Sequence, residues 1–113
     1  MATTYKVLGQ SNPTATTETR LYYVPTSTSA VVSSIVICNQ AGTAATYRIA
    51  VKSTGGSANS SAASTDWIVY GGTVAANDSA VLTIGLTMQA DAQIRVYASS
   101  STLSFSAFGS EIA

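Results

Sequence analysis

Residues 30–52 read AVVSSIVICNQAGTAATYRIAVK and contain the two clearest strand signals of the chain. Ala30 to Cys38 is rich in Val and Ile and is apolar at every position after Ser34, which is typical of a central strand buried on both faces. Residues 46–52 alternate between apolar and polar side chains, which predicts a half-buried strand. The connection 39–43 is short and carries Gly42, so we expect the two strands to pair as a hairpin.

Similar short stretches fill the rest of the chain. We expect strands, separated by turn residues, at 3–9, 18–24, 66–70, 79–86, 93–98 and 102–108, with a bend or bulge at Gly71-Gly72 and a short tail from Gly109 to Ala113. Short strands at this regular spacing predict an all-β fold, an antiparallel β-sandwich that is jelly-roll-like, with about seven or eight strands. At 113 residues the chain predicts a single domain, 1–113.

Two connecting segments stand out. Residues 10–17 include Asn12-Pro13 and several threonines, and they predict a turn or an extended N-terminal arm. Residues 53–65 contain nothing apolar larger than alanine, which predicts a flexible loop that is unusually long for a compact domain.

The apolar positions of the predicted strands give a candidate core. Its members are Ile35, Ile37, Ile49, Val51, Trp67, Leu82, Ile84, Ile94, Val96, Leu103 and Phe105. The single cysteine, Cys38, ends an apolar run, so we expect a buried, unreactive thiol.

Reactive side chains are scarce. The chain has no histidine, one cysteine, five acidic and five basic residues, whereas catalysis needs groups that exchange protons or attack electrophiles. The acids lie singly at strand ends and turns, which predicts no enzyme activity, no cofactor and no metal site. The basic residues are scattered along the sequence, and no apolar run reaches membrane-spanning length, so we expect neither nucleic acid nor membrane as a partner.

The composition favours assembly with other subunits. Charged residues make up 9% of the chain and the formal net charge is zero, against about 25% charged residues in typical domains. Such a surface is poorly protected against self-association. The candidate contact surface lies in the first predicted strand, the arm around Asn12-Pro13 and the segment Leu21–Pro25. Its candidate residues are Tyr5, Leu21, Tyr22, Tyr23 and Pro25.

Several stretches resemble small virion structural proteins of tailed phages, notably those of cyanobacteria and marine bacteria. They are Tyr5–Ser11, Leu21–Pro25 with Val31–Ser33, Cys38-Asn39 with Ala45–Val51, Val74–Ser79, Val96–Ala98 and Phe105–Glu111. The resemblance covers most of the chain, departs from the family pattern in the 53–66 loop, and implies no catalytic residues.

The resemblance implies a non-enzymatic virion component, assembled in the host cytoplasm. Our first expectation is a capsid decoration or cement protein, a homotrimer bound to the major capsid protein. The alternatives are a tail-associated part, such as a baseplate attachment or short tail fibre domain, and a carbohydrate-binding module that uses Trp67 and exposed tyrosines.

Overall fold

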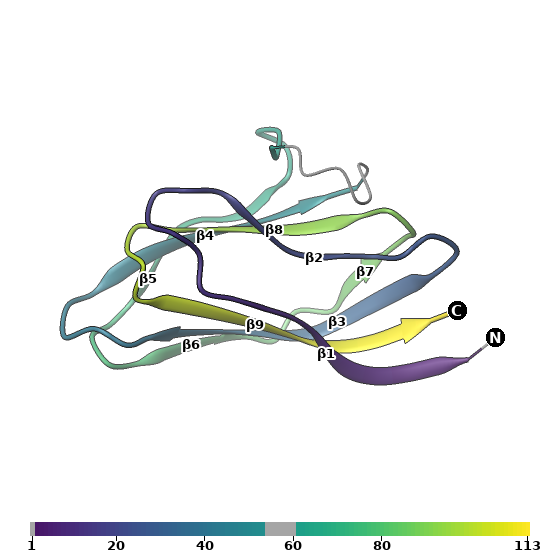
Figure 1. Cartoon of the computed structure of the whole chain (residues 1–113), viewed down its shortest axis with the longest axis horizontal. Coiled ribbons are helices and arrows are strands. Elements are labelled where there is room, and N and C mark those ends of the chain that lie inside the picture. Colours follow the sequence, from purple (N-terminus) through teal and green to yellow (C-terminus); the bar gives the residue numbers. More distant parts are fainter. Residues whose placement is uncertain (1, 54–60) are drawn as a thin grey trace.

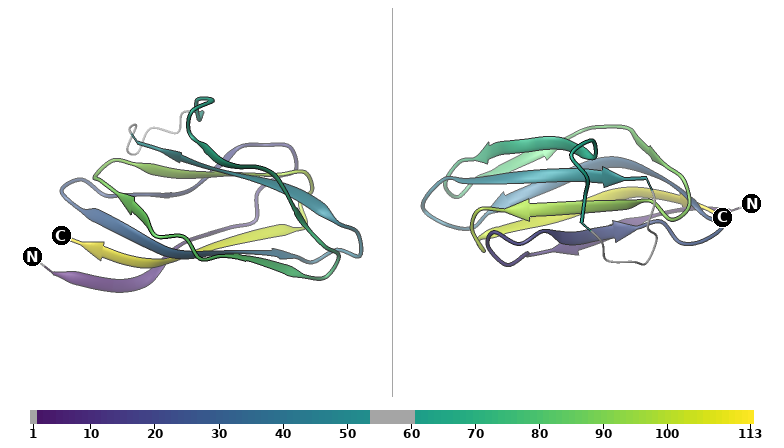
Figure 2. Two further views of the ribbon diagram at one scale, coloured as in Figure 1. Left: turned by 180° about the vertical axis from the view of Figure 1, so that it is seen from behind. Right: turned by 90° about the horizontal axis from the view of Figure 1, so that it is seen from above.

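The computed structural model describes residues 2–53 and 61–113 and shows two antiparallel β-sheets stacked face to face (Figures 1 and 2). The strands in chain order are β1 (Thr3–Ser11), β2 (Thr19–Tyr23), β3 (Ser29–Asn39), β4 (Ala45–Lys52), β5 (Trp67–Val74), β6 (Ser79–Leu82), β7 (Leu86–Met88), β8 (Gln93–Ala98) and β9 (Leu103–Ile112). The prediction of an all-β sandwich is confirmed.

The strand order is that of a jelly roll. Sheet A has the order β1-β9-β3-β6, with β7 also paired to β3, and sheet B has the order β2-β8-β4-β5. If β6 and β7 are counted as one interrupted strand, eight strands form two four-stranded sheets, and most connections cross from one sheet to the other. The two termini lie side by side, because β1 and β9 pair as far as hydrogen bonds between Ala2 and Ala113 (Figure 1).

β3 is central, as its sequence predicts. It lies between β9 on one edge and β6 and β7 on the other. A bulge at Ser33 shifts the alternation, so Val32 and Ile35 both face the core.

The predicted hairpin between β3 and β4 is wrong. Both edges of β3 are occupied within sheet A, so β4 has no edge to pair with and lies in sheet B instead. The connection is an arch between sheets, organised by the buried side chain of Asn39, whose Nδ2 donates to the carbonyl oxygen of Thr43 at 2.8 Å. A short polar connection with a glycine is compatible with either geometry.

The bulge predicted at Gly71-Gly72 is confirmed. Tyr47 pairs with Gly72 and Arg48 pairs with Tyr70, which leaves Gly71 as the extra residue of β5. Its φ of 94° lies in the left-handed region that glycine adopts without strain.

Four element boundaries differ from the sequence prediction by more than one residue. The strand predicted at 66–70 continues through the bulge, and β5 ends at Val74. The predicted strand 79–86 is interrupted at residues 83–85, and β7 begins only at Leu86. The expected tail 109–113 continues β9 to Ile112, because β1 and β3 supply partners on both edges. Gln10 and Ser11 extend β1, and residues 12–18 then cross to sheet B, with Asn12 Nδ2 donating to the Leu103 carbonyl at 2.6 Å. Of the predicted loop 53–65, residues 54–60 lie outside the described residues.

The core fills the space between the sheets. The predicted core residues Ile35, Ile37, Ile49, Ile94, Val96, Leu103 and Phe105 are completely buried. Val51, Leu82 and Ile84 are partly buried against them. Trp67 is a wrong assignment, because it lies opposite Ala50 on the face of sheet B that points away from the core.

Candidate interaction surfaces

The two outer faces of the sandwich differ in chemistry. We call the outer face of sheet A the neutral face, and the outer face of sheet B the arginine face. No pocket and no cluster of three or more metal-ligating side chains occur among residues 2–53 and 61–113. The same residues include no helix long and apolar enough to cross a bilayer.

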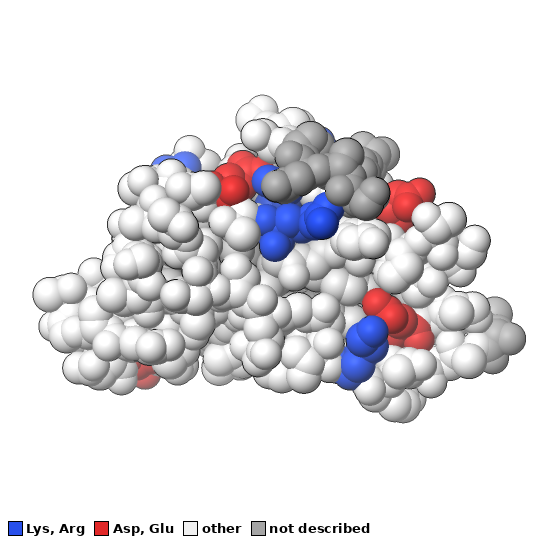
Figure 3. All heavy atoms as spheres, in the orientation of Figure 1, with Lys and Arg blue, Asp and Glu red and all other residues white. Residues whose placement is uncertain are grey.

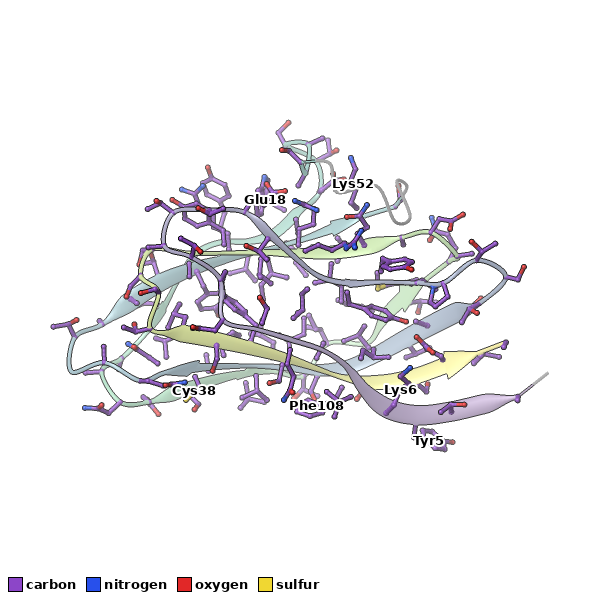
Figure 4. The ribbon with its side chains drawn as sticks, viewed as in Figure 1. Tyr5, Lys6, Glu18, Cys38, Lys52 and Phe108 are labelled. Carbon is purple, nitrogen blue, oxygen red and sulfur yellow. The ribbon has the colours of Figure 1, made fainter. Side chains whose placement is uncertain are left out.

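The neutral face carries aromatic, aliphatic and hydroxyl side chains. Its apolar members are Tyr5, Val7, Val31, Val36, Cys38, Val81, Phe108 and Ile112. Tyr5, Val7 and Val81 are 84%, 48% and 61% exposed. Serines and threonines lie between them, and no side chain that the described strands of sheet A turn outward is charged. Figure 4 shows Tyr5 and Phe108 on this side of the sandwich.

Cys38 belongs to the neutral face, which corrects the expectation of a core thiol. Ile37 points inward opposite Phe105, so its neighbour Cys38 points outward, opposite Ser79 and Ser104. The side chain is half-buried. The apolar run was misleading because β3 is covered on only one face within this chain.

The arginine face holds four of the five basic residues of the chain. It consists of Arg20, Tyr23, Arg48, Lys52, Trp67, Tyr70, Arg95 and Tyr97. The jelly-roll order places these residues from four strands in three neighbouring rows across sheet B, so residues scattered in sequence are gathered in space. In Figure 3 most of the visible blue atoms lie over this sheet, and Figure 4 shows Lys52 and Glu18 on the same side.

Arg48 lies at the centre of one row, between two tyrosines. Its guanidinium carbon is 4.1 Å from the ring centroid of Tyr70 and 4.3 Å from that of Tyr97. Trp67 contacts Tyr70 in a T-shaped arrangement with 5.6 Å between ring centroids. Arg20 lies over Tyr23 in a similar cation–π contact, 4.7 Å from the ring centroid.

Arg95 differs from the other basic residues of this face because its side chain is buried, and it is bonded to neighbouring side chains. It is almost completely buried and forms an ion pair with Glu18, which precedes β2, and its Nη1 donates to Gln93 Oε1 at 3.1 Å. The same Glu18 carboxylate accepts a hydrogen bond from the backbone N–H of Ala62 at 2.9 Å. Glu18 therefore ties β8 to the segment that leads into β5.

The predicted contact residues separate into inward and outward sets. Tyr5 and Tyr23 are exposed and Pro25 is half-buried, but Leu21 and Tyr22 are buried in the core of the chain itself. A bulge at Leu21 places both side chains inward, where simple alternation would put one of them outside. Leu21 and Tyr22 therefore offer no surface to a neighbouring subunit.

Tyr22 bridges the two sheets through Glu111. Its hydroxyl donates to Glu111 Oε2 at 2.5 Å, and Lys6 Nζ lies 3.2 Å from Glu111 Oε1. The hydrogen bond from Tyr22 is the largest cause that lowers the pKa of Glu111 below its ordinary value. Burial, followed by the contact with Glu111, raises the pKa of the Tyr22 phenol.

No protein-family model, no curated protein and no solved structure matches this chain.

Proposed function

We propose that this chain is a non-enzymatic structural protein of a tailed-phage virion, a capsid decoration protein that binds its neighbours through the neutral face. The observation that carries the proposal is the neutral face itself, an outer sheet surface with exposed Tyr5, Val7 and Val81 and no charged side chain among the described residues. Burying such a surface requires no charge to be desolvated, so contact with another subunit avoids the large free-energy cost of burying unpaired ions.

The residues behind the resemblance to phage virion proteins support the same proposal. They lie in β1, between β2 and β3, in β4, at the connection from β5 to β6, in β8 and in β9, and so they include strands of both sheets. A homotrimer bound to the capsid lattice is the arrangement we propose.

A tail location and glycan binding are the competing functions. Trp67 and Tyr70 favour glycan binding, because they form an aromatic pair on an outer face and Tyr70 is 66% exposed. A tail component would bind neighbouring tail proteins through the same neutral face, and it would be present in fewer copies per particle.

The location and copy number of the protein in purified virions test the proposal. We expect a reconstruction to place it on the capsid shell, and quantitative mass spectrometry to find hundreds of copies per particle. A few dozen copies at the tail would replace the decoration role with a tail role. Absence from the particle, together with saturable binding to a glycan array, would replace both with glycan recognition.

A further inference from the structure

Arg48 has an environment that differs from those of the other arginines. Two tyrosine rings, from β5 and β8 on either side of β4, hold its guanidinium between them. Within residues 2–53 and 61–113 its side chain has no hydrogen-bond or ion-pair partner, whereas Arg95 is bonded to Glu18 and Gln93. Arg48 is only half-buried, and no buried polar side-chain atom of the described chain lacks a partner, so the Arg48 N–H groups reach solvent.

This arrangement holds the guanidinium of Arg48 in an orientation in which it can bind an anion. The five N–H donors of arginine lie in the plane of the group and match a carboxylate in a two-pronged geometry. The rings of Tyr70 and Tyr97 restrict the orientation of that plane before anything binds. Less side-chain entropy is then lost when the contact forms.

We infer that Arg48 and its two tyrosines form the centre of a docking site for a carboxylate on an acidic protein partner. Arginine, tyrosine and tryptophan are the residue types that contribute most to binding energy in protein interfaces, and Arg48, Tyr70, Tyr97 and Trp67 gather them at one place. Lys52, on the same strand and face as Arg48, adds a positive charge that attracts acidic residues around the contact.

A protein carboxylate fits this site better than a nucleic acid does. Bases bind by stacking on open aromatic faces, but Arg48 already covers one face of Tyr70 and one face of Tyr97. Strong DNA binders neutralise roughly six to ten phosphates, and this face carries four basic residues, of which Arg95 is paired with Glu18. The inference does not depend on the proposed virion role.

The test is a titration of the full chain, labelled with nitrogen-15, with a hexaglutamate peptide as the probe. We expect saturable shifts of the Arg48 Nε–Hε and Trp67 indole signals. Arg48→Lys keeps the positive charge but removes the planar guanidinium that can donate two parallel hydrogen bonds to a carboxylate. It should weaken peptide binding about tenfold. Tyr70→Leu removes one supporting ring at an exposed position and should weaken binding several-fold, which provides a second measure if Arg48→Lys disturbs the fold.

Lys6→Gln is the matched control, because it removes a positive charge that lies beside Glu111, away from the arginine face. Its affinity for hexaglutamate should stay within about twofold of the wild type. Equal affinity of the wild type and Arg48→Lys, or no shift at Arg48 up to about 10 mM peptide, would overturn the inference. So would tighter binding of a thymidine decanucleotide or a heparin hexasaccharide, which would assign the site to nucleic acid or to an acidic glycan.

Discussion

Glu111 links the two sheets at the end of the sandwich where the termini lie. Its carboxylate accepts a hydrogen bond from Tyr22 of sheet B and faces Lys6 of β1. Because the pKa of Glu111 is lowered in the folded chain, the carboxylate contributes stability that is complete above its ordinary pKa. That contribution is lost as the pH falls through the folded-state pKa.

Tyr22→Phe should therefore destabilise the chain by about 1–2 kcal/mol at pH 7. The hydroxyl donates to a charged acceptor, and a protonated Glu111 accepts more weakly, so the difference from the wild type should shrink as the pH falls below the ordinary pKa of a glutamate. Urea unfolding at pH 7 and pH 3 measures both effects. Tyr23→Phe, which keeps the ring over Arg20, is the control and should change stability little. A loss for Tyr22→Phe that is the same at both pH values would contradict this role of Glu111.

Asn39 connects three turns at the other end of the sandwich. Its Nδ2 donates to the carbonyl oxygens of Thr43, Val74 and Ala75, and its Oδ1 accepts from the Ala41 N–H and the Thr102 hydroxyl, both at 3.1 Å. In the sequence Asn39 is an ordinary turn residue. Its role arises because the fold brings together segments that are far apart in the chain, which local patterns do not encode.

Asn39→Ala should cost about 2–4 kcal/mol, because it leaves several partly buried backbone groups without a partner. Thermal and urea unfolding would measure the loss. The exposed neighbour Gln40 provides the comparison, since Gln40→Ala should change stability by less than about 0.5 kcal/mol. Similar small losses at both positions would show that water replaces the Asn39 amide.

At the scale of the strands, the sequence predicts which residues form strands better than it predicts which strands pair with each other. Alternation of apolar and polar residues is a local property, and it correctly indicates β4 and β8. Pairing depends on which edges are available in the finished sheet, and this is why the expected β3–β4 hairpin is an arch. The continuation of β9 to Ile112 has the same origin, because its polar residues are held by strands on both edges.

The side chains buried between the two sheets should be the ones whose replacement by alanine lowers the free energy of unfolding most. Ile49 and Phe105 are completely buried in opposite sheets, and Phe105 meets Tyr47 in a T-shaped contact with 6.3 Å between ring centroids. Ile49→Ala and Phe105→Ala should each lower the free energy of unfolding by about 2–5 kcal/mol. Val81→Ala, at an exposed position of β6, should cost less than about 0.5 kcal/mol. Losses below about 1 kcal/mol at both buried positions would contradict the assigned strand faces.

At the scale of the whole molecule, the two outer faces divide the chemistry of the chain. Basic and aromatic residues gather on sheet B, and the outward side of sheet A is uncharged in the described strands. The low charge content visible in the sequence predicts association but not its surface, because which residues share a face depends on the bulges at Leu21 and Ser33. The arginine face could not be predicted from the sequence either, because its residues come from four strands that only the folded sheet brings together.

Association through the neutral face gives the last prediction. We expect the wild type to sediment as a trimer at micromolar concentration, and Val81→Lys to shift it to monomer. The introduced ammonium group would be buried against an uncharged neighbouring surface without a partner. Val81 is 61% exposed in the single chain, so the substitution should leave the monomer folded.

Thr46→Lys provides the matched control, because Thr46 is exposed on sheet B and the substitution adds the same charge. It should leave the sedimentation coefficient of the trimer unchanged. Cys38 reports on the same surface, since its half-buried thiol lies on the neutral face. A thiol reagent should label Cys38 faster in Val81→Lys than in the wild type, because dissociation uncovers it. A wild type that is monomeric throughout the micromolar range, or a Val81→Lys variant that remains a trimer, would show that the neutral face does not join subunits.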